Sequence, residues 1–341
     1  MRAWLQKKGV EPSLRAYGIT ALSYMALGLF STLIVGLIMQ TMGDLGTEAG
    51  VPLEWLSEIG TSAMALAGPA IGAAVAYGLK APRMVLFAAL FAGAAGYDAA
   101  GPAGSFAASI FAVEAGKLVS QETKIDILVT PAVTIFAGAA GAAAAGPPLE
   151  AVLLQFGQFL MWGVEQQPLV MGLITAVFMG LALTAPISSA AVAILLQLEG
   201  VAAGAATVGC TAQMVGFAVS SYRENKGSGL VALGIGTSML QIANIVRNPK
   251  ILIPPTAAAA IAGPLAVMLF QMENNPEGAG MGSSGFVGQI MTINTMGASA
   301  DVWTGILLFH FILPAVISLM VSEWMRRKEW IQFGDMKIEQ S

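Results

Sequence analysis

Residues 228–272 read SGLVALGIGTSMLQIANIV, then RNPK, then ILIPPTAAAAIAGPLAVMLFQM. The first apolar part is interrupted by glycines and ends with Gln241 and Asn244, and the second opens with two prolines and Thr256. Lipid offers no hydrogen bonds, so non-helical backbone at membrane depth persists only inside protein or beside a watery cavity. This stretch therefore predicts a pair of broken or re-entrant elements that line a polar site.

The composition predicts that the remainder of the chain is an all-α, polytopic membrane protein. The 341 residues are 56% hydrophobic and 11% charged, with a mean hydropathy of +0.74, whereas soluble domains are about 25% charged. The apolar stretches are long runs without period-two alternation, which favours helices over a barrel. Forty glycines suit closely packed membrane helices.

The distribution of charge predicts the topology. A basic segment (1–16) precedes a first span at about 17–42, and the following loop (43–60) carries acidic residues but no Lys or Arg. Arg326, Arg327 and Lys328 follow the last span, at about 302–322. The positive-inside tendency then places both termini in the cytoplasm. We expect an N-terminal segment (1–16), one transmembrane domain (17–323) and a C-terminal tail (324–341), with eight to ten membrane elements.

Several elements are predicted to be short, broken or re-entrant. The run at 84–97 is short for a hydrocarbon core about 30 Å thick. We expect Pro147-Pro148 to break a helix, and the long apolar run at 168–198 to be two elements that meet at 184–189. Residues 228–246 are expected to enter and return on the same side, and 278–300 is too polar and Gly-rich for a lipid-facing helix.

Two segments of the sequence resemble each other, which suggests an internal repeat. The half that begins KIDILVTPAVTIFAGAAGAA at Lys124 resembles the half that begins KILIPPTAAAAIAGPLA at Lys250. In each, a Gly-rich helix precedes a Lys, an apolar run, a proline-containing break and a helix of small residues. Repeats with broken helices in matching positions point to the binding site of a transporter. Because Ala/Gly-rich helices also resemble one another through composition alone, the repeat is a hypothesis.

Polar residues within the apolar runs are the candidates for solute binding. Asp98 and Glu114 lie in small, apolar surroundings, and a charge at the membrane centre costs at least about 2.5 kcal/mol. Serines, threonines and amides near the breaks can donate to a solute. The substrate-binding candidates are Asp98, Glu114, Thr130, Ser188, Ser189, Gln213, Asn244, Asn248, Thr256 and Asn294.

Most of the candidates also have a purely structural interpretation. Asp98 can cap a short helix, the amides of Asn244 and Asn248 can hold helices together, and hydroxyls can repair the carbonyls that a proline leaves free. We expect His310 to be a neutral histidine bonded to a backbone carbonyl and Cys210 to be a small packing residue.

The sequence carries no recognisable catalytic, cofactor or nucleic-acid motif. His310 is the only histidine and Cys210 the only cysteine, which excludes a multi-His or Cys-rich metal site. There is no Gly-x-Ser-x-Gly motif, no phosphate-binding Gly-x-x-x-x-Gly-Lys-Ser/Thr loop and no basic face for nucleic acid. We expect no metal and no cofactor, and leave open whether the chain takes part in an enzyme complex.

Several strings resemble the membrane subunit, IIC, of the sugar phosphotransferase system, and more narrowly its branch of perfringolysin-regulator-like membrane proteins. They are GYDAAGPAGSFAA (96–108), KIDILVTP (124–131), TAPISSAA (184–191), GFAVSSYRENK (216–226) and NPKILIPPTAAAAIAGPLA (248–266). The resemblance implies re-entrant hairpins, a solute site, a homodimer and a bacterial plasma membrane. This chain shows no soluble module with an active His or Cys. We therefore expect it either to use separate IIA- and IIB-like partners or to work without them, as an ion-coupled carrier or a sensor.

The leading hypothesis is a permease for a small polar organic solute, sugar-like or a carboxylate, with alternating access through proline-broken helices. The alternative is a membrane-embedded ligand sensor that binds without net transport. A third hypothesis is an intramembrane enzyme, and the absence of catalytic groups from the sequence argues against it.

Overall fold

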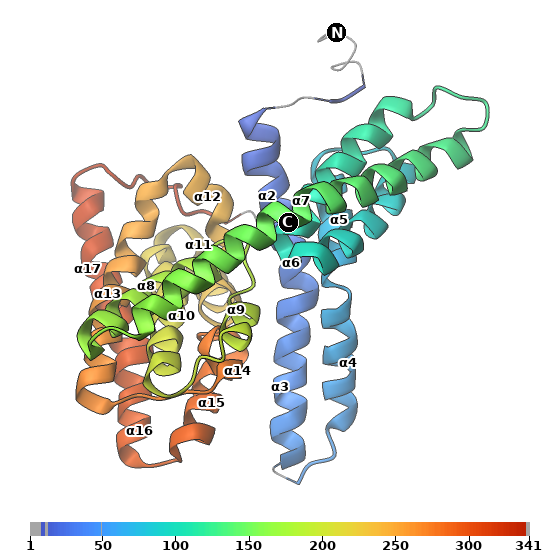
Figure 1. Cartoon of the computed structure of the whole chain (residues 1–341). Helices are drawn as coiled ribbons and strands as arrows, with labels where there is room; N and C mark the ends of the chain where they lie inside the picture. The colour runs from blue at the N-terminus through green and yellow to red at the C-terminus, as the bar shows by residue number, and fades with distance from the viewer. Residues whose placement is uncertain (1–7, 11–12, 49, 339–341) are drawn as a thin grey trace. The chain divides into compact units, whose positions relative to one another are not determined.

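The computed structural model describes residues 8–10, 13–48 and 50–338. Arg2 and Lys7 of the predicted basic segment, and the last three residues, lie outside them. The described chain is helical, apart from one bridge between Gly200 and Asn274, which confirms the predicted all-α class (Figure 1). It forms two compact units, Met1–Val152 (unit 1) and Leu153–Ser341 (unit 2). The predicted division into a single transmembrane domain with two terminal segments stays a prediction.

Unit 1 begins with a long helical stretch and a helix pair. Its elements are η1 (Ala16–Ala21), α2 (Leu22–Leu29), η2 (Phe30–Ile34), α3 (Val35–Glu48), α4 (Glu54–Ala65), α5 (Ala67–Gly78), α6 (Arg83–Val119) and the first part of α7 (Asp126–Val164). The predicted loop at 43–60 is mostly helical, because α3 and α4 continue into it. A methyl group on Gly36 would lie 2.7 Å from the Gly60 carbonyl oxygen, so glycines let these two backbones pack directly.

The helix α6 is a hairpin of two antiparallel arms. Its backbone leaves helical geometry at Ala100 (φ −157°, ψ 37°) and at Gly101 (φ 60°, ψ −149°). A side chain at Gly96 would overlap the backbone of Gly104, and one at Gly116 would meet Val85. Residues this far apart along one straight helix could not touch. The short predicted run at 84–97 is therefore the first arm of this α6 hairpin, and it turns back inside the protein.

The prolines of α7 do not break it. The helix continues through Pro131, Pro147 and Pro148 to Val164, so the predicted break at Pro147-Pro148 is wrong. Membrane helices tolerate proline where the neighbouring backbone can adjust, and the residues before this pair are alanines and a glycine. Thr130, which we placed in a break, instead lies near the start of the helix.

Unit 2 surrounds one central helix. Its elements are the end of α7, then α8 (Pro168–Thr184), α9 (Ser189–Leu195), α10 (Gly200–Ser220), α11 (Tyr222–Val231), η3 (Ala232–Gly236), η4 (Ser238–Gln241), α12 (Ile242–Arg247), η5 (Pro249–Leu252), α13 (Ile253–Phe270), α14 (Pro276–Ala279), η6 (Ser284–Phe286), α15 (Val287–Met296), α16 (Ala300–Gly305), η7 (Ile306–Ile312) and α17 (Leu313–Arg327). Helix α10 packs against α8, α13 and α17. In the most apolar 18-residue segment of α10, 94% of the residues are buried.

Two further hairpins fold against α10. Residues 222–247 run through α11 and η3, turn at Thr237 and return through η4 and α12. The predicted hairpin at 228–246 lies within this range. Both Asn225 and Gln241 donate to the Met336 carbonyl, so the two ends of this 222–247 hairpin lie together. In residues 276–296, a methyl group on Gly278 would lie 2.6 Å from the Met291 β-carbon, which shows that this 276–296 hairpin also doubles back.

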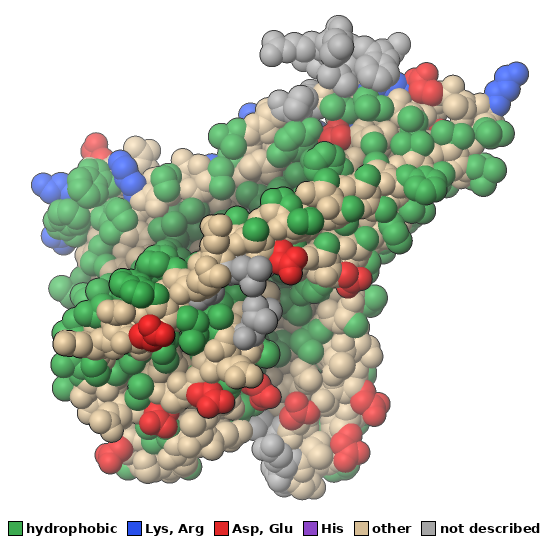
Figure 2. Space-filling view, in the orientation of Figure 1, with side chains coloured by type: hydrophobic (Ala, Val, Ile, Leu, Met, Phe, Trp, Pro, Cys, Tyr) green, Lys and Arg blue, Asp and Glu red, His purple; other side chains and the backbone are tan. Residues whose placement is uncertain are grey.

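The lengths and exteriors of the helices agree with a multi-pass membrane protein. By length and composition, six helical stretches of the described residues suffice to cross a membrane, and α4 with α5, bent by 50°, can make a seventh. The α6 stretch counts among the six, although its two arms fold back on each other. Large apolar side chains cover the outside of each unit (Figure 2), including Phe87, Phe136, Leu269 and Met320. Water-facing surfaces rarely carry so many.

Candidate functional site

The middle of α10 carries buried polar side chains rather than a uniform apolar core. Thr207, Thr211 and Gln213 are fully buried. Two of the three are threonines that donate to the carbonyl four residues earlier, which satisfies their hydroxyls within the helix. The longer side chain of Gln213 reaches outward, so it is available to whatever packs against α10.

Three interruptions of the helical backbone meet this part of α10. The first lies between α8 and α9, where Ala185 is extended (ψ 162°). The second is Thr237, also extended, at the turn of the 222–247 hairpin. The third is the turn of the 276–296 hairpin, where Gly282 and Gly285 have positive φ. The two breaks predicted in the opening stretch and at 184–189 are therefore present.

A chain of hydrogen bonds joins the first two breaks through α10. The Thr184 and Ser238 hydroxyl oxygens are 2.8 Å apart. Thr184 also donates to Gln213 Oε1 at 3.4 Å, and Gln213 Nε2 donates to the Thr256 hydroxyl at 2.9 Å. The chain thus links α8, α10, η4 and α13, and we call Thr184, Gln213, Ser238 and Thr256 the hydroxyl–amide chain.

Serine hydroxyls bond to carbonyl groups that the breaks leave free. Ser283 donates to the Gly234 carbonyl at 2.6 Å and Ser284 to the Gly236 carbonyl at 2.7 Å, so the turns of the two hairpins are joined directly. Ser189 donates to the Gly280 carbonyl at 2.6 Å. A freed carbonyl in a dry interior costs free energy unless it finds such a donor. These contacts show how carbonyls at the three breaks find donors within the protein.

One glycine is needed where the third turn touches α10. Gly282 has φ +56°, and a methyl group there would lie 2.8 Å from the carbonyl carbon of Cys210. Both the conformation and the close approach exclude a larger residue. Cys210 itself is buried among apolar side chains, in line with the packing role expected for it.

The groups that meet at this site are uncharged. Among the described residues of the hydroxyl–amide chain and the three turns there are hydroxyls, one amide, thioether sulfur and backbone carbonyls, but no Asp, Glu, Lys or Arg. Every one of these polar groups can donate to or accept from a hydroxyl. The arrangement suits a neutral ligand with many hydroxyl groups better than an ion.

A second polar cluster contacts α10 at Thr207 and Thr211. Gln289 Nε2 is 3.0 Å from His310 Nδ1 and 3.3 Å from the Thr211 hydroxyl. The expected bond from His310 to a backbone carbonyl is not present, and His310 Nε2 and Gln289 Oε1 are buried without a partner among the described residues. Asn274 also donates to the Thr207 hydroxyl at 2.7 Å, which holds the start of the 276–296 hairpin on α10.

Four of the predicted binding residues are gathered near α10. Gln213 and Thr256 belong to the hydroxyl–amide chain, and Ser189 bonds to the third turn. Ser188 is half-buried in the break between α8 and α9.

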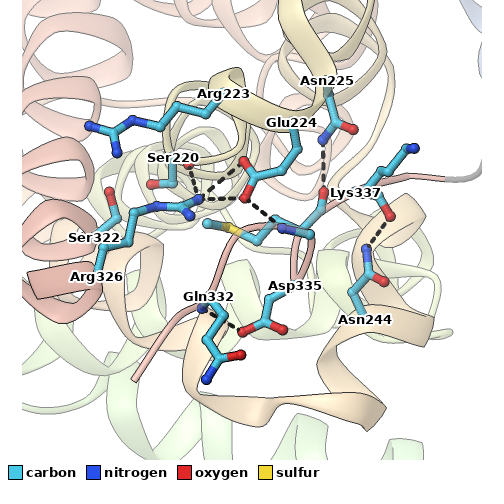
Figure 3. Close-up of polar contacts among 12 residues, drawn as sticks. Ser220, Arg223, Glu224, Asn225, Asn244, Ser322, Arg326, Gln332, Asp335 and Lys337 are labelled. Carbon is cyan, nitrogen blue, oxygen red and sulfur yellow. Dashed lines mark hydrogen bonds and ion pairs between the residues drawn. The ribbon is translucent and has the colours of Figure 1, made fainter. Parts of the chain in front are cut away.

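Asn244 lies instead at the base of the 222–247 hairpin, where it holds the C-terminal tail (Figure 3), and Asn248, which follows this hairpin, also bonds to the tail. Asn244 Nδ2 donates to the Lys337 carbonyl at 2.9 Å. Asn248 Nδ2 donates to Asp335 Oδ2 at 2.8 Å and to the Trp330 carbonyl at 3.1 Å. Both amides thus have structural partners, and their predicted role in binding stays untested.

The same base contains a buried ion pair. Arg326 donates to Glu224 at 2.8 Å and to the Ser220 carbonyl at 3.1 Å, and Gly334 N also donates to Glu224 (Figure 3). The Glu224 side chain is fully buried. Asn225 donates to the Met336 carbonyl at 2.7 Å. We call this contact between the tail and the 222–247 hairpin the tail clamp.

The other predicted residues are not among those that bond at the three breaks. Asp98 is exposed beside the turn of the α6 hairpin. Glu114 pairs with Lys117 at 3.2 Å, and Thr130 donates to Asp126 at 2.6 Å; all three lie in unit 1. Asn294 is exposed on α15.

Residue-by-residue reasoning missed Thr184, Ser238, Ser283 and Ser284 as site residues. A signal was nevertheless present, because hydroxyl residues follow glycines in GIGTS (234–238) and GMGSSG (280–285). Glycine permits a turn, and a following serine or threonine can bond to its open carbonyls. The pairing of these two strings across the fold could not be predicted from either alone.

The fold and the site define a class: a polytopic helical membrane protein whose re-entrant hairpins bring neutral polar groups to a central helix. Residues 19–338 match the family model described as phosphotransferase system, EIIC. The chain therefore belongs to the EIIC family, and it is the membrane permease component of a sugar phosphotransferase system that works with IIA and IIB components. No curated protein matches the chain, and no solved structure does so. The narrower resemblance to perfringolysin-regulator-like proteins stays a prediction.

Proposed function

We propose that the three breaks around α10 bind a neutral, polyhydroxylated solute, a sugar, and pass it across the membrane by alternating access. The observation that carries the proposal is the junction of the Thr184, Thr237 and Gly282 turns on one buried helix. Broken helices in a membrane protein line binding sites because their free backbone groups can hydrogen-bond a substrate.

The chemistry of the site favours a sugar over a carboxylate. A carboxylate at membrane depth requires a cation or several N–H donors to offset its desolvation, and the described residues of the hydroxyl–amide chain offer none with a positive charge. A sugar hydroxyl both donates and accepts. It can bond to the Thr184 and Ser238 hydroxyls in place of their bond to each other, at little net cost, because one hydrogen bond is exchanged for another of similar strength.

The same contacts suggest how access alternates. In this structure the turns are closed on one another by the bonds from Ser283 and Ser284 to Gly234 and Gly236. A solute that competes for these donors separates the turns, and the non-helical residues beside them absorb the change in backbone angles. We further propose, from the sequence, that both termini are cytoplasmic, that the membrane is a bacterial plasma membrane and that the protein is a homodimer.

The test is sugar uptake by proteoliposomes that contain the full chain and its IIA and IIB partners. Gln213→Leu and Ser238→Ala should lower uptake at least tenfold, because each removes a group from the hydroxyl–amide chain. Thr134→Val is the matched control, since Thr134 is an equally buried hydroxyl bonded only to the Thr130 carbonyl in unit 1. Uptake unchanged in the first two variants would reject the site.

The same preparation separates a permease from a sensor. A permease moves labelled sugar into the vesicles, whereas a sensor binds it with no net flux. Thermal-shift measurements against a panel of neutral sugars and carboxylates identify the solute class. Stabilisation by carboxylates alone would contradict the proposal of a neutral solute.

A further inference from the structure

Unit 1 contains a pocket of about 360 Å³ that the proposed sugar site does not use. It is formed by the segment before η1, by η1 itself, by the end of α5 and by the second arm of the α6 hairpin. The polar side chains that line it are Ser13, Arg15, Thr20, Lys80, Glu114 and Lys117. Its volume lies within the range of small-molecule sites, about 300–1,000 Å³.

The floor of the pocket holds a buried charge pair with unused bonding capacity. The Lys117 side chain is only 3% exposed, and its ammonium donates to the Gly9 carbonyl at 3.0 Å and to Glu114 Oε1 at 3.2 Å. An ammonium has three donors, so one remains. Glu114 Oε2 is buried and has no donor in hydrogen-bonding geometry among the described residues, while the Tyr17 hydroxyl lies beside the same carboxylate. A donor and an acceptor thus lie side by side, which is the complement of a ligand hydroxyl.

The rim of the pocket carries positive charge that no acidic residue in the described part of the chain neutralises. Arg15 and Lys80 are exposed, and neither forms an ion pair with the described part of the chain. Three cations and one carboxylate give the pocket a net charge of +2. Arginine and lysine at a concave surface favour a phosphate group, which arginine can bind in a bidentate manner.

We propose that this pocket binds a phosphate ester that also carries hydroxyl groups. The phosphate lies against Arg15 and Lys80, and a hydroxyl reaches the Glu114–Lys117 pair. Two sources have this chemistry: a soluble polyol phosphate and the headgroup of phosphatidylglycerol. None of its residues belongs to the proposed sugar site, so the proposal stands whether or not the sugar site is correct.

Binding is measured by isothermal titration of the full-length protein in phosphatidylcholine nanodiscs, with glycerol 3-phosphate, glycerol and inorganic phosphate as probes. Glycerol 3-phosphate should bind at least tenfold more tightly than glycerol. The double variant Arg15→Gln/Lys80→Gln should weaken this binding at least tenfold. The control Arg327→Gln/Lys328→Gln removes the same two charges from exposed positions in unit 2 and should change it less than twofold.

Glu114→Gln tests the hydroxyl contact separately. It should remove the preference for glycerol 3-phosphate over inorganic phosphate while leaving phosphate binding in place. If phosphatidylglycerol added to the nanodiscs displaces glycerol 3-phosphate in the wild type, and does so less in the rim variant, the source is the lipid. If it does not, the source is the soluble ester.

Absence of binding by glycerol 3-phosphate and by phosphatidylglycerol would overturn the proposal. So would equal binding by the wild type and the rim variant. Both rim residues are exposed, so we expect the variant to fold, and size-exclusion chromatography of each preparation checks this before titration.

Discussion

The α6 hairpin of unit 1 and the 222–247 hairpin of unit 2 are similar at their bases but differ at their turns. Each precedes one of the two segments that begin with Lys124 and Lys250, and each has its base tied by an end of the chain. In unit 1, Lys8 pairs with Glu122 and donates to the Ser120 carbonyl. In unit 2, the tail clamp ties Met336 to Asn225.

The turns of the two hairpins show the difference. The α6 hairpin turns at Ala100 and Gly101, and its arms meet through Gly96 and Gly104 with no side chain between them. The 222–247 hairpin turns at Thr237, where hydroxyls of Thr184, Ser283 and Ser284 bond to it. Glycine contacts fix a backbone permanently, whereas hydroxyl contacts can be exchanged for those of a solute. One hairpin is therefore suited to a scaffold and the other to a site.

The largest effect is expected at the tail clamp. Glu224→Ala leaves Arg326 buried without its partner, and breaking a buried ion pair costs about 3–5 kcal/mol. Thermal unfolding of the detergent-solubilised protein should show a large fall in Tm, and limited proteolysis should cut the tail. Arg223→Ala, which breaks the exposed pair with Glu323, is the control and should change stability by less than about 1 kcal/mol.

A smaller loss of stability is expected in the α6 hairpin. Gly96→Ala forces a methyl group onto the Gly104 backbone, and such overpacking costs about 1–3 kcal/mol. Gly227→Ala is the control, because nothing lies within 4 Å of a methyl group at that position. Equal Tm values for the two variants would show that the arms are not held by this contact.

Substitutions in the hydroxyl–amide chain are expected to affect uptake more than stability. Thr184→Val alone leaves the buried Ser238 hydroxyl without this partner, at a cost of about 1–3 kcal/mol. The double variant Thr184→Val/Ser238→Ala removes both groups and should recover part of that loss, while sugar uptake stays low. Recovery of uptake together with stability would mean that the pair only supports the fold.

The smallest effect on stability is expected at Asp98. This side chain is exposed and has no hydrogen bond to the described residues, so Asp98→Asn should change the free energy of unfolding by less than about 0.5 kcal/mol. Our sequence-based proposal that Asp98 contacts the solute predicts a loss of uptake at unchanged Tm. Full uptake would remove Asp98 from the site.

Local sequence signals predicted several of the backbone breaks. Proline and glycine interruptions at 184–189 and 228–256 indicated broken backbone, and the breaks at Ala185, Thr237 and Asn248 are present. The prediction was less successful at Pro147 and Pro148, where the helix continues. A proline only weakens a helix locally, and packing of the surrounding backbone decides whether the helix breaks.

Partners distant in the sequence could not be predicted in the same way. In the sequence, Asn244 and Asn248 look the same as amides that bind a solute. In the structure, their amide groups instead donate to the tail residues Lys337 and Asp335. Ser283 and Gly234 are separated by 49 residues, and nothing local to either string specifies that they meet.

The sequence by itself determined the class of protein, because its hydropathy requires lipid and its EIIC-like strings extend along the chain. It also indicated where the backbone can turn, since glycine, proline and hydroxyl residues act through their nearest neighbours. Only the tertiary structure decided which turns share α10 and which amides hold the tail. Those choices depend on long-range packing, in which each buried polar group takes the partner that the assembled helices bring within reach.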